Sequence, residues 1–360
     1  MKTLLEKKIT PDWEKFIDCI NRKGTPERVH NIELFLDGEI QNAVCEKFNL
    51  LDGFNGDDPY FNEKKQVQIQ RFLGYDYVRM GLENMDFVLS FSTTEDTAKR
   101  GHNGGRSFID ESKGPITNWM EFEKYPWPDP KKASTRAMEW YEKNLPDDMC
   151  IIGSGGFAHP AEHLMWLMGY ETICYALYDN RELVKAIYDK LMKIYVASIN
   201  IILQFDKVKI IWGSDDMGFK TGTLISPDDL REFVLPSHKK MAEISHEHGK
   251  PYLLHSCGNL SDIMYDLIND VHIDAKHSFE DTIEQVTDAK LRYGNEITLL
   301  GGIDVDFLCN ANEKDIRKRV RKTLEICMPG GGYCLGTGNS VANYIPLDSY
   351  LIMLDEGRSY

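Results

Sequence analysis

A histidine and a cysteine two residues apart, His255 and Cys257, follow the apolar run 251–254. Side chains two apart in a strand point to the same face, so the imidazole of His255 and the thiolate of Cys257 can reach one metal ion. Cys334, after the pair Gly331-Gly332, can supply a third ligand. Three ligands of this type are typical of a catalytic zinc site, whose fourth position takes water or substrate. The alternative is structural: a hydrogen-bonded core histidine and two cysteines that act as small buried apolar side chains.

Eight apolar segments that alternate with helical patterns are predicted to position these residues. Strands are expected at 32–36, 75–80, 150–153, 209–212, 251–255, 271–275, 297–300 and 333–335. Helices are expected at 226–249, where Ser226 and Pro227 form a strong start, and at 261–269, 281–293 and 312–327. This alternation predicts an α/β fold, a (β/α)8 TIM barrel. The alternative, a doubly wound sheet, is disfavoured because no G-x-G-x-x-G motif follows an early strand.

The whole chain, 1–360, is predicted to form one barrel domain with two additions. Residues 1–28 are expected to be a helical appendage. Residues 93–145, which contain clusters of Gly, Trp and Pro, are expected to be an insertion near the active site. A long insertion at the top of a barrel usually shapes or covers the active site.

Barrel enzymes build their active sites at the carboxyl ends of the strands, and this rule selects further candidates. His255, Cys257 and Cys334 all fall at such ends. The other strand ends contribute these polar residues: Glu33, Asp37, His159, Asp215, Asp216, His277, Glu280 and Asp304. Each carboxylate has a structural alternative, because acidic residues at strand ends often cap the next helix.

Charge and composition exclude several classes of function. With 57 acidic and 42 basic residues, the formal net charge is −15, so the chain would repel a phosphate backbone and no nucleic-acid partner is expected. No segment approaches the ~18 apolar residues of a membrane span, and the N-terminus lacks a signal-peptide pattern. The eight cysteines are scattered, which suits reduced thiols. We therefore expect a cytoplasmic protein that does not bind membranes.

Four segments of the chain form a recognisable set. They are Thr25-Pro26-Glu27-Arg28-Val29, Gly213-Ser214-Asp215-Asp216-Met217-Gly218, His255-Ser256-Cys257-Gly258-Asn259 and Gly331-Gly332-Tyr333-Cys334. Together they resemble the uroporphyrinogen decarboxylase superfamily across nearly the whole chain, and within it the zinc-dependent corrinoid methyltransferase branch. A fold relative, cobalamin-independent methionine synthase, binds zinc through H-x-C, a later Glu and a distant Cys. The resemblance therefore implies a Zn²⁺ site with four ligands: His255, Cys257, Glu280 and Cys334. His277 is expected to support this site rather than bind the metal.

One segment departs from the decarboxylases of this superfamily. Those enzymes carry an arginine-rich N-terminal segment for the carboxylates of their substrate, whereas residues 29–37 here are apolar and acidic. Decarboxylation of a porphyrinogen also needs no metal, which would leave His255, Cys257 and Cys334 without a purpose. A decarboxylase is therefore only an alternative.

The resemblance implies a zinc-dependent methyltransferase that moves a methyl group between a small molecule and a corrinoid carried by a separate protein. A methyl ether-type donor, and hence O-demethylation, is favoured, and a thiol acceptor is the other option. Glu33 or Asp215 is predicted to protonate the leaving oxygen. The residues predicted to bind the substrate are Phe35, His159, Trp212 and Met217.

A hypothesis of a different class is a non-catalytic barrel, in which zinc is structural and the acidic top docks a partner protein. An open metal position and a cavity beside it would favour the enzyme. The sequence leaves the oligomeric state and the identity of the methyl donor open, and it is compatible with a homodimer.

Overall fold

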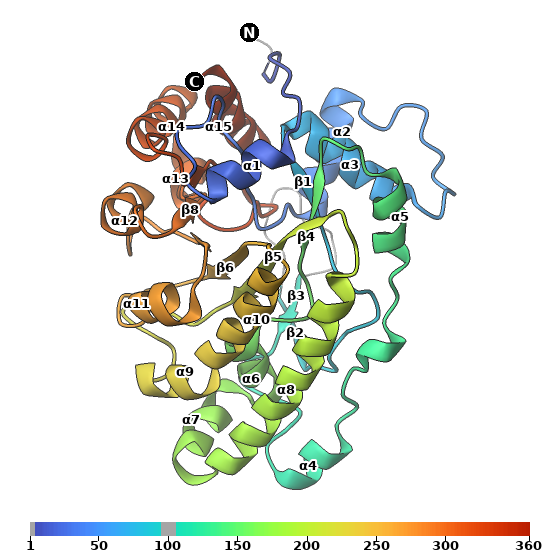
Figure 1. The fold of residues 1–360 in the computed structure, drawn as a ribbon, viewed down its shortest axis with the longest axis vertical. Coiled ribbons are helices and arrows are strands. Elements are labelled where there is room, and N and C mark those ends of the chain that lie inside the picture. Colours follow the sequence, from blue (N-terminus) through green and yellow to red (C-terminus); the bar gives the residue numbers. More distant parts are fainter. Residues whose placement is uncertain (1–3, 95–105) are drawn as a thin grey trace.

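A parallel sheet of seven strands forms the centre of the computed structural model, which describes residues 4–94 and 106–360. The strand order is β1-β4-β5-β6-β7-β8-β9. The strands are β1 (Tyr77–Met80), β4 (Cys150–Gly153), β5 (Val208–Asp215), β6 (Tyr252–Ser256), β7 (Ala275–His277), β8 (Thr298–Leu300) and β9 (Tyr333–Cys334). Helices surround the strands (Figure 1).

Residues 29–36 occupy the eighth position, between β9 and β1. Asn31 forms a parallel bridge with Leu335 of the β9 side. On the β1 side the contact uses a side chain, because the backbone N–H of Glu33 donates to the hydroxyl of Tyr77 at 2.9 Å. The architecture is the (β/α)8 barrel expected from the sequence. The prediction of a regular strand at 32–36 was wrong. The segment forms only isolated bridges, because it contacts β1 through a side chain and not through a ladder of backbone hydrogen bonds.

The helices cover the outside of the barrel, and one of them covers an end. Helix α1 (Trp13–Ile20) lies at the amino ends of the strands, where Thr298 Oγ1 donates to the carbonyl of Ile20 at 2.6 Å. Apart from two helices in the insertion described below, the others are α2 (Gly38–Phe48), α3 (Phe61–Leu73), α6 (Pro160–Met168), α7 (Tyr170–Asp179), α8 (Arg181–Ile202), α9 (Pro227–Phe233), α10 (Leu235–Glu247), α11 (Met264–Asp266), α12 (Val286–Tyr293), α13 (Val305–Asn310), α14 (Glu313–Cys327) and α15 (Leu347–Ser359).

The helix expected at 226–249 begins where the sequence predicts but is divided in two. The Ser226 side chain accepts a hydrogen bond from the Asp229 N–H at 3.1 Å, which is an N-cap. The chain then breaks at Val234, between α9 and α10. Pro236 explains the break, because it has no N–H to continue the hydrogen-bond ladder and its ring clashes with the preceding turn.

Two other predicted boundaries are wrong around the seventh strand. The strand expected at 271–275 is β7, Ala275–His277, because a π-helical turn over Leu267–Val271 extends the preceding helix. That turn ends at His272 with φ 61°, a left-handed conformation that redirects the chain. The helix expected at 281–293 starts later, as α12 (Val286–Tyr293), whereas α14 begins at the Asn312 cap as expected.

The insertion predicted at 93–145 begins in an antiparallel hairpin of β2 (Phe91–Thr94) and β3 (Arg106–Ile109). It continues through α4 (Trp119–Lys124) and α5 (Arg136–Asn144), and α1 falls within the appendage predicted at 1–28. Residues 1–3 and 95–105 of these two segments lie outside the described residues. That residues 1–28 and 93–145 are additions to a single barrel domain stays a prediction.

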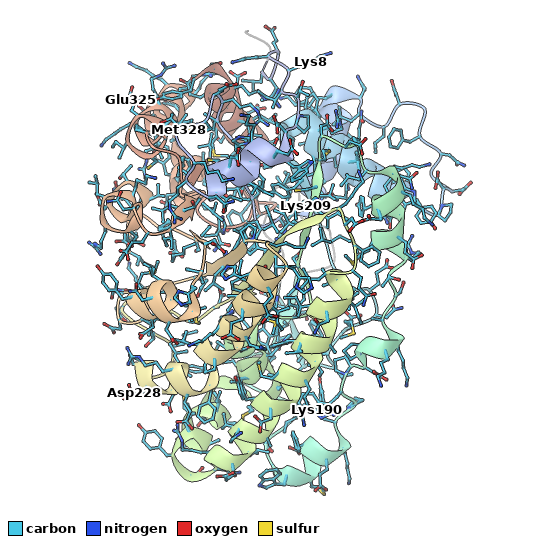
Figure 2. All side chains as sticks on the ribbon, in the orientation of Figure 1. Lys8, Lys190, Lys209, Asp228, Glu325 and Met328 are labelled. Carbon is cyan, nitrogen blue, oxygen red and sulfur yellow. The ribbon has the colours of Figure 1, made fainter. Side chains whose placement is uncertain are left out.

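Apolar side chains fill the space between the sheet and the surrounding helices, and charged ones such as Lys8, Asp228 and Glu325 lie at the periphery (Figure 2). The described helices include none that is long and apolar enough to cross a bilayer.

Candidate metal centre and active site

The histidine and cysteine of the H-x-C motif lie at the carboxyl end of β6, beside a carboxylate that follows β5. His255 Nε2 is 3.4 Å from Cys257 Sγ and 3.8 Å from Asp216 Oδ1. Ligand atoms of all three residues lie within 4.8 Å of one another, the one such group of His, Cys and acidic residues in the described part of the chain. His255 is buried, and the other two residues are partly exposed.

The distances in this group fit a zinc ion. Zinc binds imidazole nitrogen at about 2.1 Å and thiolate sulfur at about 2.3 Å, so a tetrahedral ion holds these two atoms about 3.6 Å apart. The observed separation of His255 Nε2 and Cys257 Sγ is 3.4 Å. A nitrogen, a sulfur and a carboxylate oxygen are all zinc donors. The residues therefore fit the metal without rearrangement of the His255 and Cys257 side chains.

His277 orients the His255 ring. Their Nδ1 atoms are 2.7 Å apart, so one ring donates to the other. When the proton is on His255 Nδ1, the lone pair of its Nε2 faces Cys257, as in metal-bound histidines that donate through their second nitrogen. Burial lowers the pKa of both rings, that of His277 to about 3, so both are neutral at pH 7. His277 thus contacts His255, and its supporting role toward a metal stays a prediction.

A contact between two glycines brings Asp216 to Cys257. The Gly218 N–H donates to the Cys257 carbonyl at 3.2 Å. Gly258 has φ +83°, and a Cβ there would lie 2.1 Å from the Gly218 carbonyl carbon. Only glycine permits both the backbone conformation and the approach. The Cys257 N–H then donates to Asp216 Oδ1 at 3.2 Å, which fixes the carboxylate next to the thiol.

The Cys257 thiol is protonated in the absence of a cation. Burial raises its pKa, and the Asp216 charge raises it further. Asn339 Nδ2 donates to its sulfur at 3.3 Å, which favours the thiolate but does not outweigh burial. A nearby cation would reverse this balance, because metal coordination deprotonates a thiol.

Cys334 lies beside Cys19 of α1 and not in the group of three. The Cys19 thiol donates to the carbonyl of Tyr333 at 3.2 Å. A hydrogen bond with Cys334 lowers the pKa of Cys19 to about 6, whereas burial raises that of Cys334. The third donor that the structure brings to His255 and Cys257 is Asp216, and Cys334 as a ligand stays a prediction from the sequence.

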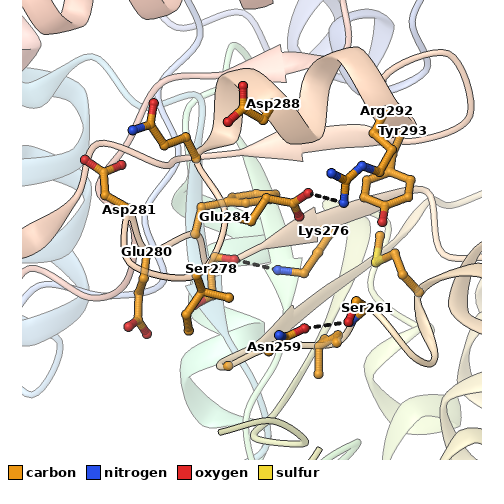
Figure 3. Close-up of a pocket in the computed structure, with 16 residues that line it drawn as sticks. Asn259, Ser261, Lys276, Ser278, Glu280, Asp281, Glu284, Asp288, Arg292 and Tyr293 are labelled. Atoms are coloured by element: carbon orange, nitrogen blue, oxygen red, sulfur yellow. Dashed lines mark hydrogen bonds and ion pairs between the residues drawn. The ribbon is translucent and has the colours of Figure 1, made fainter. Parts of the chain in front are cut away.

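Glu280, the fourth predicted ligand, lines a cavity of about 360 Å³ between the loops that follow β6 and β7. Lys276 Nζ donates to the Ser278 carbonyl at 2.5 Å at its wall. Figure 3 shows the Glu280 carboxylate pointing away from the Lys276 side chain. Glu280 is not among the donors that lie together in the described part of the chain, so its role as a ligand is also still a prediction.

Glu33 is a buried carboxyl group at the eighth strand position. Its Oε1 accepts from the Thr337 N–H at 2.8 Å, and its Oε2 accepts from the Thr337 hydroxyl at 2.5 Å. Burial raises the pKa of Glu33 to about 8, more than these two hydrogen bonds lower it. At pH 7 the group is therefore mostly protonated, and its role as the proton donor stays a prediction.

Asp215, the second predicted acid, caps a helix. Its carboxylate accepts from the N–H groups of Ala161 and Glu162, at 3.0 and 2.8 Å, in the first turn of α6, and His238 Nε2 lies 3.0 Å from it. Side chains alternate along β5, so Asp216 points to the opposite side from Asp215. That alternation, counted from Trp212, is the sequence signal that could have singled out Asp216, already a strand-end candidate, as a metal ligand.

His159 and Glu162 form a pair at the start of α6. His159 Nδ1 lies 2.7 Å from Glu162 Oε2. Burial raises the pKa of Glu162 to about 7, and the charges of Asp215 and Asp216 add to the effect. Glu162 is a further candidate acid that the sequence analysis missed, since nothing marks a residue in the first turn of a helix as buried.

The remaining predicted substrate residues have different surroundings. Trp212 is fully buried, with its ring 4.6 Å from the guanidinium carbon of Arg79. Phe35 is 51% exposed and lines a cavity of about 220 Å³ together with Glu33 and Arg79. Met217 is fully buried in the apolar core. Of these three residues, Phe35 is the one that lines a cavity open to a ligand, whereas Trp212 and Met217 are both fully buried.

The family model described as Uroporphyrinogen decarboxylase (URO-D) matches residues 111–360, well over half of the chain. The chain belongs to the uroporphyrinogen decarboxylase family. The resemblance inferred from the motifs is confirmed, and all three residues of the candidate metal centre lie within the matched part of the family.

Two proteins of Methanosarcina mazei are similar to this family member. A methylated-thiol–coenzyme M methyltransferase is 29% identical over 158 residues, which are 42% of this chain and 40% of that relative. The match thus spans less than half of the relative's length. The solved structure of a methyltransferase is 15% identical and covers 99% of both chains with a TM-score of 0.66, which shows a shared fold.

Proposed function

We propose that the protein is a zinc-dependent methyltransferase that moves a methyl group between a small molecule and a corrinoid carried by a separate protein. The observation that carries the proposal is the fit of His255, Cys257 and Asp216 to a zinc ion at the carboxyl ends of β5 and β6. Similarity to a methyltransferase over part of the chain supports the same reaction class.

His255, Cys257 and Asp216 would hold the metal, and three protein ligands leave a position for substrate. Zinc bound there would supply Lewis acidity toward the oxygen of a methyl donor, or hold a thiol acceptor as thiolate. Glu33 would hold a proton at its carboxyl group and deliver it to the departing oxygen. A methyl ether donor is favoured over a thiol acceptor, because a proton donor is needed only when an alkoxide or phenoxide leaves.

The test is a methyl-transfer assay with zinc-loaded protein, a reduced corrinoid protein and candidate methyl donors. We expect cob(I)alamin to be converted to methylcob(III)alamin, followed as an absorbance change. The control is the same mixture with protein stripped of metal by a chelator. If ethers, amines, alcohols and thioethers all fail as donors, and thiols fail to demethylate the corrinoid, the proposal is wrong. Release of CO₂ from a carboxylated substrate without metal would favour the decarboxylase. A protein that binds zinc but turns over no substrate would favour the barrel that docks a partner protein.

The third metal ligand can be determined by substitution. We expect Asp216→Asn to lower zinc affinity about 10- to 100-fold, because an amide oxygen is a weaker donor than a carboxylate. Cys334→Ser should retain zinc, since the Cys334 thiol lies against Cys19. Mass-spectrometric metal analysis after dialysis measures both. Zinc loss in Cys334→Ser with retention in Asp216→Asn would instead support the ligand set predicted from the sequence.

A further inference from the structure

Arg79 of β1 places a cationic side chain inside the barrel wall. Its guanidinium carbon lies 4.6 Å from the centre of the Trp212 ring. It also lines the cavity of about 220 Å³ that Glu33 and Phe35 line. The metal centre is close enough for the Arg79 charge to lower the pKa of His255, after burial and the charges of His277 and Lys276. A ligand in this region would thus lie between a cation and the candidate metal ligands.

The charge of Arg79 is not compensated within the described residues. Burial lowers the pKa of its guanidinium to about 10, so it stays protonated at pH 7, and no carboxylate of the described chain offsets the effect. Glu33, an acid of the same cavity, is mostly neutral at that pH because its own pKa is about 8. Arg79 is partly buried, and an anion that binds beside it would compensate its charge.

Unpaired polar atoms mark the same region. Arg79 Nε and Gln70 Oε1 are buried without a hydrogen-bond partner among the described residues, and both side chains line the cavity. Trp212 Nε1, beneath the guanidinium, is a third such atom. Buried polar groups in native proteins are almost always paired, and water or a polar ligand in the cavity would supply the partners of these atoms.

We propose that Arg79 binds the carboxylate of the substrate, so that the methyl donor is a small acid that also carries a methyl ether. The choice of a methyl ether rests on the proposed function, whereas the carboxylate subsite does not. A guanidinium presents donors in a fork that matches a carboxylate. The Trp212 ring lies against the guanidinium. Phe35 and Glu33 line the same cavity as Arg79, and Glu33 would serve the oxygen that departs.

Binding is tested without the corrinoid protein, by calorimetry on zinc-loaded protein at pH 7. The probes are 3- and 4-methoxybenzoate and methoxyacetate, each paired with its uncharged amide. We expect the wild type to bind at least one acid about 10- to 100-fold more tightly than the matching amide. Arg79→Met, which keeps the apolar stem, should lose this preference, and Arg79→Lys should keep part of it. Arg231→Gln, an exposed arginine of α9, is the matched control and should behave as wild type.

The wild-type comparison needs no variant, so a folding defect of Arg79→Met cannot hide the result. Equal affinity for acids and amides, no binding of any acid, or an acid preference that survives in Arg79→Met would each overturn the carboxylate subsite. Acid binding without methyl transfer would contradict only the proposed function and would still support the carboxylate subsite.

Discussion

Replacing Cys257 by serine is expected to remove zinc from the purified protein and to lower methyl transfer about 1000-fold. An alcohol is a far weaker zinc ligand than a thiolate. Loss of the metal raises the activation free energy of methyl transfer by several kcal/mol, the usual order of magnitude for a Lewis acid. Each ~1.4 kcal/mol lowers the rate by a factor of ten. Metal analysis by mass spectrometry and initial rates measure the two effects. His255→Ala should behave in the same way.

Cys327→Ser is the matched control for this substitution. Cys327 is a buried cysteine of α14, away from the candidate metal centre, so its variant should keep zinc and activity even if it is less stable. Retention of a full zinc equivalent by Cys257→Ser would contradict the assignment of the site.

Glu33→Gln is expected to lower turnover about 100-fold at pH 7 while zinc stays bound, because the amide cannot donate a carboxyl proton. The pKa of Glu33 is about 8, so the wild-type rate should fall as pH rises through 8, where Glu33 loses its proton. The Gln variant should lack this limb. Initial rates between pH 6 and about 9.5 test the profile.

Stability should respond to the same group in a defined direction. The native pKa of about 8 is above the ordinary 4.5, so between these values the folded state holds a proton that the unfolded state has released. The stabilisation from Glu33 is therefore fully present below pH 4.5 and is lost as pH rises to about 8. Glu33→Gln should flatten that part of the curve of melting temperature against pH.

The substitution Thr337→Val tests whether the fall in rate at high pH is due to Glu33 or to another acid of the site. The Thr337 hydroxyl donates to Glu33 and lowers its pKa, so its removal should shift the limb of the rate profile to higher pH. A limb that persists in Glu33→Gln or does not move in Thr337→Val would assign it to another group, such as Glu162.

The barrel could be predicted because its strands carry their own signal. Residues 150–153 and 297–300 are short apolar runs, and β4 (Cys150–Gly153) and β8 (Thr298–Leu300) are found there. The irregular contact of residues 29–36 with β1, which closes the barrel, could not be predicted, because it depends on the Tyr77 hydroxyl of another strand. Nor could the break at Val234, although Pro236 gave a local signal that was overlooked.

The candidate site was predictable only where a local rule applies. His255 and Cys257 share a face because they are two apart, and the structure brings them together. The direction of the Cys334 side chain depends on the register of the strands around the closed barrel. No local sequence pattern encodes that register. Arg79 was overlooked although it interrupts an apolar strand, where a charged residue marks either an edge or a functional interior.

The contact of Gly218 with Gly258 makes the loops after β5 and β6 a single module. Any side chain at Gly258 would push the two loops apart and separate Asp216 from Cys257, even with every ligand intact. An engineer who moves this metal centre into another barrel must therefore transfer both glycines along with the donors.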